Sequence, residues 1–247
     1  MYNFQDKTIR EIALEAPITV RVFEKHKIDF CCGGRVPFTE ACKNAGADSI
    51  VVLTELDQVL QSPNTNVNDD LTKTAGDLIK HIVRTHHDFT RSEIDRLRPL
   101  ADKVVSRHGE SHSELAEIRD LFNNLAEELL MHMSKEEVML FPYIERLERA
   151  VETNGVPPMP HFGTVNNPVQ MMMYEHDQAG EMLRKMRALS ADYTAPDGAC
   201  PSYKGLYAGL QYLEADLHRH IHLENNILFP QAIDFEKQIY AVAGSVE

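Results

Sequence analysis

The most constraining feature of the sequence is a phrase that occurs twice. Residues 132–142 read HMSKEEVMLFP, and residues 220–230 read HIHLENNILFP. In both, a glutamate follows the first histidine by four positions, and the phrase ends in Leu-Phe-Pro. Residues four apart lie on one face of a helix. Because a buried carboxylate is costly unless it is paired or bound to a metal, a repeated His–Glu pair in an apolar frame requires a chemical partner.

Four long segments carry apolar residues with the 3.6-residue period of a helix. They span about 74–107, 110–149, 167–191 and 201–240. Pro99 is expected to kink the first helix or to end it early. Four long helices with modest connections predict an all-α fold, an up-down four-helix bundle at 74–240.

The first 61 residues have a different pattern, one of short helices and tight turns. Thr8 and Glu11 form a capping box that predicts a helix start, and Cys31-Cys32-Gly33-Gly34 marks a turn. The stretch 62–73 contains Pro and several Asn residues and is expected to be a linker. The sequence therefore predicts a small helical domain at 1–61, a linker, and the bundle.

The overall composition excludes several functions. A net charge of −13 over 247 residues is unlike a nucleic-acid-binding protein or one that binds an anionic membrane surface. No apolar stretch is long enough to span a bilayer, and the N-terminus lacks the features of a signal peptide. Four cysteines do not form a secreted disulfide framework. A cytoplasmic location is expected.

The apolar faces of the four helices select candidate metal ligands, because those faces must point into the bundle. Each face contains a histidine, and the second and fourth faces add a glutamate. The selected residues are His86, His132, Glu136, His176, His220 and Glu224. His87 lies about 100° round the helix from His86, so His86 is preferred. His87, His81 and His222 are expected around the metal or at the surface.

Four imidazoles and two carboxylates suit two adjacent metal ions, with two imidazoles on each and both glutamates bridging. This ligand set favours iron, manganese or zinc over soft metals, and zinc rarely takes so many ligands. A non-haem di-iron site is the resulting hypothesis. The alternative is a structural bundle without metal, since a single histidine on an apolar face is usually a hydrogen-bonded core residue.

Several phrases resemble those of the iron–sulfur cluster repair (repair-of-iron-centres, RIC) family. They are HIVRTHHDF, HMSKEEVMLFP, YEHDQAG and HIHLENNILFP, with KIDFCCGG in the small N-terminal domain. The resemblance implies a hemerythrin-like bundle that holds two non-haem iron ions per chain, bridged by oxo and carboxylate groups, on the six residues named above. The chain departs from the family pattern at one position, where His86-His87 stands in place of His-Asp.

The resemblance also implies a function, the repair of iron–sulfur clusters damaged by oxidative or nitrosative stress, with iron supplied from the di-iron centre. Damaged iron–sulfur proteins would be partners, and nitric oxide or oxygen species would be small-molecule ligands. Cys31 and Cys32 would serve in redox or iron transfer; alternatively, they are small buried residues beside a Gly-Gly turn. A nitric oxide or oxygen sensor or carrier, and a nitric oxide reductase, stay open. So does the oligomeric state, a homodimer included.

Overall fold

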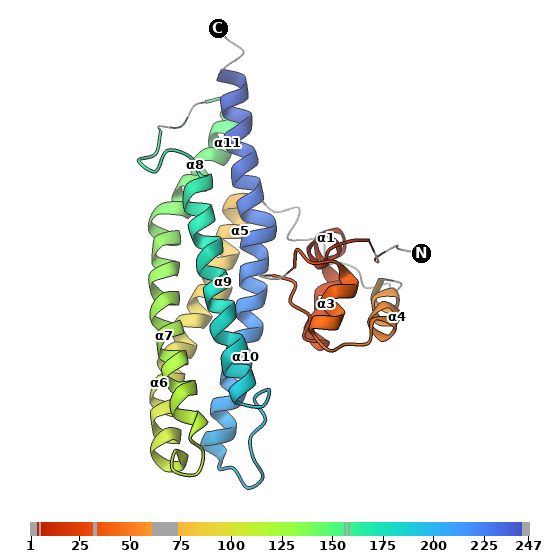
Figure 1. The fold of residues 1–247 in the computed structure, drawn as a ribbon. Coiled ribbons are helices and arrows are strands. Elements are labelled where there is room, and N and C mark those ends of the chain that lie inside the picture. The colour runs from red at the N-terminus through yellow and green to blue at the C-terminus, as the bar shows by residue number, and fades with distance from the viewer. Residues whose placement is uncertain are drawn as a thin grey trace.

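The computed structural model describes residues 4, 6–31, 34–60, 74–155, 157 and 159–243. Figure 1 shows a long helical bundle with a small helical domain against one side. Among the described residues, the β structure consists of one isolated bridge between Thr8 and Pro37. The expected all-α fold is confirmed. The expected linker at 62–73 lies outside the described residues, as do Cys32 and Gly33.

The bundle consists of four helical rods, three of which are interrupted by a π turn. The first rod contains α5 (Ala75–Ile82), the π turn Val83–His87 and α6 (Asp88–His108). The second contains α7 (Glu114–Lys135), the π turn Glu136–Leu140 and α8 (Phe141–Thr153). The third is α9 (Asn166–Leu189). The fourth contains α10 (Pro201–Leu223), the π turn Glu224–Leu228 and α11 (Phe229–Ala243). The four-helix architecture is as expected.

The cap at Thr74 and the exposure of Pro99 explain where the first rod begins and why it continues to His108. The Thr74 side chain caps α5 by accepting a hydrogen bond from the backbone N–H of Asp77, at 3.1 Å. Pro99 does not end the helix early, since α6 continues through it to His108. Pro99 has no N–H to donate to the carbonyl oxygen of Asp95. Both residues are exposed, so water can satisfy that carbonyl.

Two apolar clusters fill the bundle, one on each side of a polar layer. On the second rod, Leu125 and Leu129 belong to one cluster, whereas Leu140 and Ile144 belong to the other. The same division holds on the fourth rod, where Leu217 and Leu228 lie in different clusters. The stretches between the clusters contain the repeated His–Glu pairs. The bundle therefore encloses its polar groups between two apolar cores.

The small domain contains four α-helices and one short 3₁₀ helix within the described residues. These are α1 (Ile9–Glu15), the 3₁₀ turn Pro17–Thr19, α2 (Val20–Lys25), α3 (Phe38–Asn44) and α4 (Ser49–Leu60). Thr8 and Glu11 form the expected capping box. Within the described part of the chain, no helix is both long and apolar enough to cross a bilayer.

The small domain is docked against the fourth rod. Ile221 of α10 is 1% exposed and belongs to the apolar core of the small domain. Nearby, the Asn226 side chain donates to the Phe30 carbonyl oxygen at 3.4 Å, and Arg219 forms an ion pair with Glu24. Because Ile221 follows His220, this interface lies directly behind the polar layer.

Candidate metal centre

The polar layer brings together four histidines and two glutamates from all four rods. They are His87, His132, Glu136, His176, His220 and Glu224, each at most 3% exposed. They form two overlapping groups, in each of which the potential ligand atoms lie within 4.8 Å of one another. One group is His87, Glu136, His220 and Glu224; the other is His132, Glu136, His176 and Glu224. Both glutamates belong to both groups.

The imidazoles form two pairs that meet through their Nε2 atoms. Nε2 of His87 lies 3.0 Å from Nε2 of His220, and Nε2 of His176 lies 2.9 Å from Nε2 of His132. Two neutral imidazole nitrogens at this distance must share a proton or repel each other. A cation bound at each pair would receive the lone pairs of its two imidazoles.

The carboxylates complete the two groups, and three of their four oxygens have no hydrogen-bond partner among the described residues. Neither oxygen of Glu136 accepts a hydrogen bond from a described residue, although Nε2 of His132 and His87 lie 3.3 and 3.5 Å away. Glu224 receives His220 Nε2 at 2.8 Å, while its other oxygen lies 3.2 Å from His176 Nε2. Burying an uncompensated carboxylate costs several kcal/mol. The orphaned oxygens of Glu136 therefore fit the binding of a cation.

Hydrogen bonds at the far side of the rings fix how three imidazoles face the centre. The Nδ1–H of His87 donates to Glu137 at 2.6 Å, and that of His132 donates to Glu175 at 2.8 Å. His176 Nδ1 donates to the side-chain oxygen of Asn225 at 2.9 Å. Such outer hydrogen bonds set the tautomer that leaves the Nε2 lone pair free for a metal. Nδ1 of His220 has no partner among the described residues.

The pKa values of the layer show how strongly its members interact. Burial opposes protonation of His132, but the charge of Glu136 and the hydrogen bond to Glu175 raise the pKa of His132 to about 10. Burial lowers the pKa of the His220 imidazole. Against the effect of burial, the neighbouring imidazoles hold the pKa of Glu224 well below its usual range. Glu224 thus stays ionised where a cation would bind.

The structure brings five of the six expected ligands together, but it leaves His86 outside both groups. His86 Nδ1 instead donates to Asp216 at 3.0 Å, and its ring stacks at 5.7 Å on that of His220. The cause is the π turn Val83–His87. An α-helix would align His86 with Ile82, whereas i→i+5 spacing aligns His87 with it. His87 is also followed by Asp88, so the His-Asp pair of the family pattern is present one residue later.

The other histidines considered from the sequence lie around the layer. His222 is buried, accepts a hydrogen bond from Asn226 at 2.8 Å and packs against the ring of Phe30. His81 is half-buried and meets His86 edge to face. Neither belongs to the two groups.

Cys31 is 6% exposed and lies in the core of the small domain. Its backbone N–H donates to a side-chain oxygen of Asp29 at 3.0 Å, and its thiol donates to the same oxygen at 3.4 Å. The geometry of a vicinal pair with Cys32 lies outside the described residues.

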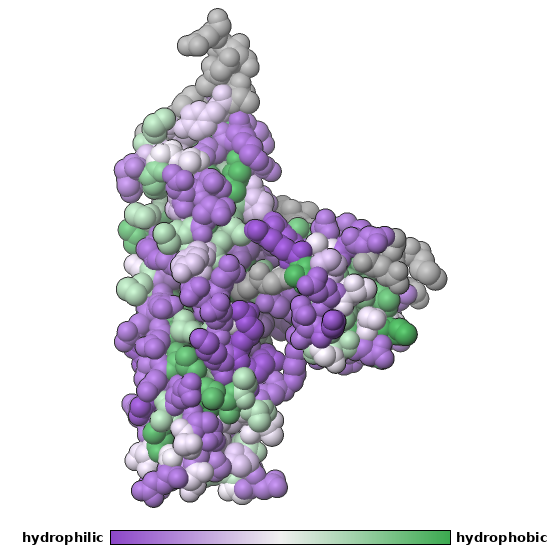
Figure 2. Space-filling model, viewed as in Figure 1, coloured by the Kyte–Doolittle hydropathy of each residue, from purple (hydrophilic) through white to green (hydrophobic). Residues whose placement is uncertain are grey.

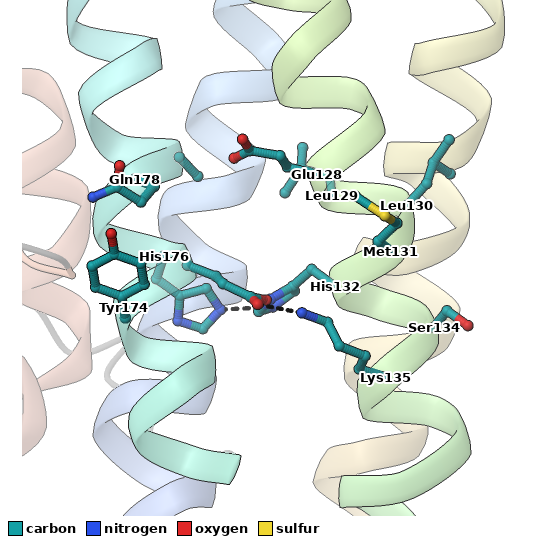
Figure 3. A pocket seen from close by; sticks show the side chains of 12 residues that line it. Glu128, Leu129, Leu130, Met131, His132, Ser134, Lys135, Tyr174, His176 and Gln178 are labelled. Carbon is teal, nitrogen blue, oxygen red and sulfur yellow. Dashed lines mark hydrogen bonds and ion pairs between the residues drawn. The ribbon is translucent and has the colours of Figure 1, made fainter. Parts of the chain in front are cut away.

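A groove of about 890 Å³ between α7 and α9 leads to one side of the layer. Figure 3 shows His132 and His176 at its floor, with Lys135 reaching across and Tyr174 at its edge. Lys135 forms an ion pair with Glu175, the residue that anchors His132. The exposed Met131 and Tyr174 make the rim partly apolar. A molecule in this groove would lie next to two potential ligands.

Some of these residues were not identified from the sequence. They are the outer partners Glu137, Glu175 and Asn225, whereas His87 was expected around the metal or at the surface, with His86 preferred as the ligand. Glu137, Glu175 and Asn225 are the immediate neighbours of Glu136, His176 and Glu224. An acid or amide next to these three predicted ligands is the sequence signal that could have identified them.

Two family models match the chain. Residues 78–232 match the hemerythrin HHE cation binding domain. Residues 5–60 match a domain of unknown function, DUF542. A hemerythrin domain implies non-haem iron binding, and the two histidine–glutamate groups are residues able to hold it.

Similar curated proteins share nearly the whole length of the chain. The iron-sulfur cluster repair protein ScdA of Staphylococcus haemolyticus is 31% identical over 224 residues, covering 91% of this chain and 96% of that protein. The iron-sulfur cluster repair proteins YtfE of Dickeya chrysanthemi and Yersinia pseudotuberculosis are 32% and 31% identical, each covering 94% of this chain and 98% of the relative. The chain therefore belongs to the iron–sulfur cluster repair proteins of the hemerythrin HHE family.

Proposed function

We propose that this protein repairs damaged iron–sulfur clusters by supplying iron from a non-haem di-iron centre in the polar layer. The observation that carries the proposal is the pair of overlapping four-residue groups that share Glu136 and Glu224. Each group would hold one iron ion, and both glutamates would bridge. The ligands would be His87 and His220 on one ion and His132 and His176 on the other. His87 thus replaces His86 in the set expected from the sequence.

The ligand composition of the layer, four imidazoles and two carboxylates, favours reversible binding of iron. Two carboxylates provide less charge compensation for two iron ions than a carboxylate-rich site would. A site of this kind should hold iron less tightly, which favours a donor over a permanent cofactor. Iron here is cargo, and the residues of the layer bind and release it.

The groove between α7 and α9 supports exchange at the His132–His176 side. Its floor includes both of these ligands, and the Lys135–Glu175 ion pair lies at the same place. If Glu175 releases His132, that imidazole loses the hydrogen bond that orients it. We infer that this side of the layer is the one at which iron leaves.

Cys31 and Cys32 are proposed to serve in transfer between the centre and the damaged client. Cys31 lies in the same apolar core as Ile221, the residue after His220. This continuity places the thiol-bearing domain against the rod that carries two ligands. The substitution of both cysteines should impair repair while leaving bound iron unchanged.

Isotope transfer is the direct test of donation. The protein is loaded with isotopically enriched iron and mixed with a purified iron–sulfur hydro-lyase whose cluster has been damaged by peroxide. Mössbauer spectroscopy of the re-isolated client should then detect the enriched iron in its cluster as activity returns. Restored activity without the isotope would contradict donation. Steady consumption of nitric oxide with a reductant, without iron transfer, would instead identify a nitric oxide reductase.

A further inference from the structure

A second cavity lies where the small domain meets the bundle, and it has a different character from the groove. It is a cleft of about 230 Å³ lined by α1 and the segment after Gly34 on one side and by α9, the π turn Glu224–Leu228 and α11 on the other. Figure 2 shows strongly hydrophilic side chains gathered at the junction between the small domain and the bundle. None of the six proposed iron ligands lines it.

Two guanidinium groups are brought to this cleft by backbone hydrogen bonds. The N–H of Arg10 donates to the carbonyl oxygen of Gly34 at 2.7 Å, and the N–H of Ile9 donates to that of Val36 at 3.2 Å. These two hydrogen bonds hold the start of α1 against the segment that carries Arg35. Arg10 and Arg35 therefore face the same space because of the fold of the small domain, and both line the cleft.

The positive charge at this place is not balanced by the residues around it. Arg10 donates to the backbone oxygen of Asn225 at 3.4 Å, and Arg35 forms no ion pair with a described carboxylate. Lys237 also lines the cleft, but it is paired with Asp234 at 3.1 Å. Three cations and one carboxylate give the lining a net charge of about two in a chain whose total is −13.

The neighbouring positive charge affects the pKa of Arg10. Burial and the neighbouring charge of Arg35 lower the pKa of Arg10, against a smaller opposing effect of Glu11. Asp177 lies close enough for Arg35 to act on its pKa, but no ion pair joins them. Two like charges that line one cleft without an ion pair to a described carboxylate favour an anion between them.

We propose that this cleft binds a small dianion with carboxylate or phosphate groups. Guanidinium groups bind both kinds of oxyanion through paired N–H donors. The opposite wall includes the apolar side chains of Val169, Met173 and Phe229, which would contact the carbon skeleton of an organic anion. The volume of the cleft restricts the ligand to the size of a small metabolite.

The cleft also adjoins the metal layer through one residue. Asn225 accepts the hydrogen bond of Arg10 through its backbone oxygen and that of His176 through its side chain. Binding of an anion to Arg10 would compete with the first of these hydrogen bonds. The anion site is therefore placed to communicate with His176, although its existence does not depend on bound iron.

Isothermal titration calorimetry with succinate and with inorganic phosphate tests the proposal and separates the two sources of the anion. At least one of them should bind the full-length protein, and neutral salt should weaken the binding. Arg35→Gln and Arg10→Gln should each lower the affinity about tenfold, a loss of about 1.4 kcal/mol. Arg21→Gln is the matched control, because Arg21 is exposed on the same domain and does not line the cleft.

Three results would overturn the proposal. The first is that neither anion binds at millimolar concentration. The second is that Arg35→Gln binds as tightly as Arg21→Gln. The third is binding that disappears when iron is removed, since that would place the anion on the metal. Because the expected binding persists in the metal-free protein, failure of the anion site and failure of the di-iron proposal can be distinguished.

Discussion

Nε2 of His87 lies 3.0 Å from Nε2 of His220, although the two rings come from different rods. His132 and His176 repeat this arrangement at 2.9 Å. Outer hydrogen bonds to Glu137, Glu175 and Asn225 direct three of these rings inward. The layer is therefore preorganised for cations, because its lone pairs converge before any ion is bound.

His87→Ala is expected to remove about half of the iron or more, since it deletes one of four imidazole ligands and the partner of His220. His86→Ala is the matched control, because the neighbouring ring lies outside both groups and is bonded to Asp216. It should retain most of its iron. Elemental analysis of both variants, after the same reconstitution, distinguishes them. If His87→Ala keeps its iron and His86→Ala loses it, His86 and not His87 is the ligand from the first rod.

Iron should stabilise the wild-type protein but not a variant that lacks a bridging carboxylate. At free iron about a thousandfold above the dissociation constant, linkage adds about 4 kcal/mol to the free energy of unfolding. Thermal unfolding with and without iron should show this as a higher Tm of the iron-loaded wild type. In Glu136→Gln the difference should be small, because the amide is neutral and has one oxygen instead of two.

The control for that comparison is Glu236→Gln. Glu236 is also buried, but it accepts hydrogen bonds from Val165 and Tyr143, outside the layer. Its substitution should leave the iron-dependent rise in Tm intact. A rise in Glu136→Gln as large as that of the wild type would show that this carboxylate does not contact the metal.

Glu175→Gln should weaken iron binding without removing a ligand. Although burial acts in the opposite direction, hydrogen bonds from His132 and Lys135 lower the pKa of Glu175 to about 2, so the carboxylate is ionised at neutral pH. Loss of its charge should lower metal affinity by about 10- to 100-fold. Competition with a chelator measures the change. Glu181→Gln, an exposed position on the same helix, should match the wild type in this assay.

Ile221→Ala should loosen the small domain while the centre retains its iron. The Ile221 side chain is 1% exposed and packs in the core of the small domain. Its truncation should cost about 2–5 kcal/mol of packing free energy. Limited proteolysis should then cut faster within residues 1–60, with iron content unchanged. Unaltered proteolysis would show that this contact does not hold the domains together.

The sequence predicted the bundle and five of the six residues in the layer because buried positions follow the α-helical period. It did not predict the π turn at Val83–His87. The helix on each side of the turn keeps its own 3.6-residue period, so the apolar pattern does not reveal one extra residue between them. That turn exchanges His86 for His87. The cleft with Arg10 and Arg35 could not be predicted from the sequence either, because it depends on how the small domain docks on α9 and α11.

The most direct test of the central claim is elemental analysis of freshly purified, untagged protein after anaerobic reconstitution, with an absorption spectrum of the same sample. The account predicts about two irons per chain and near-ultraviolet charge-transfer bands. Two irons in the wild type and about one or fewer in Glu224→Ala, with helix content retained, would support the shared carboxylates. Protein that takes up no iron under these conditions would contradict the di-iron centre, and with it the proposed function.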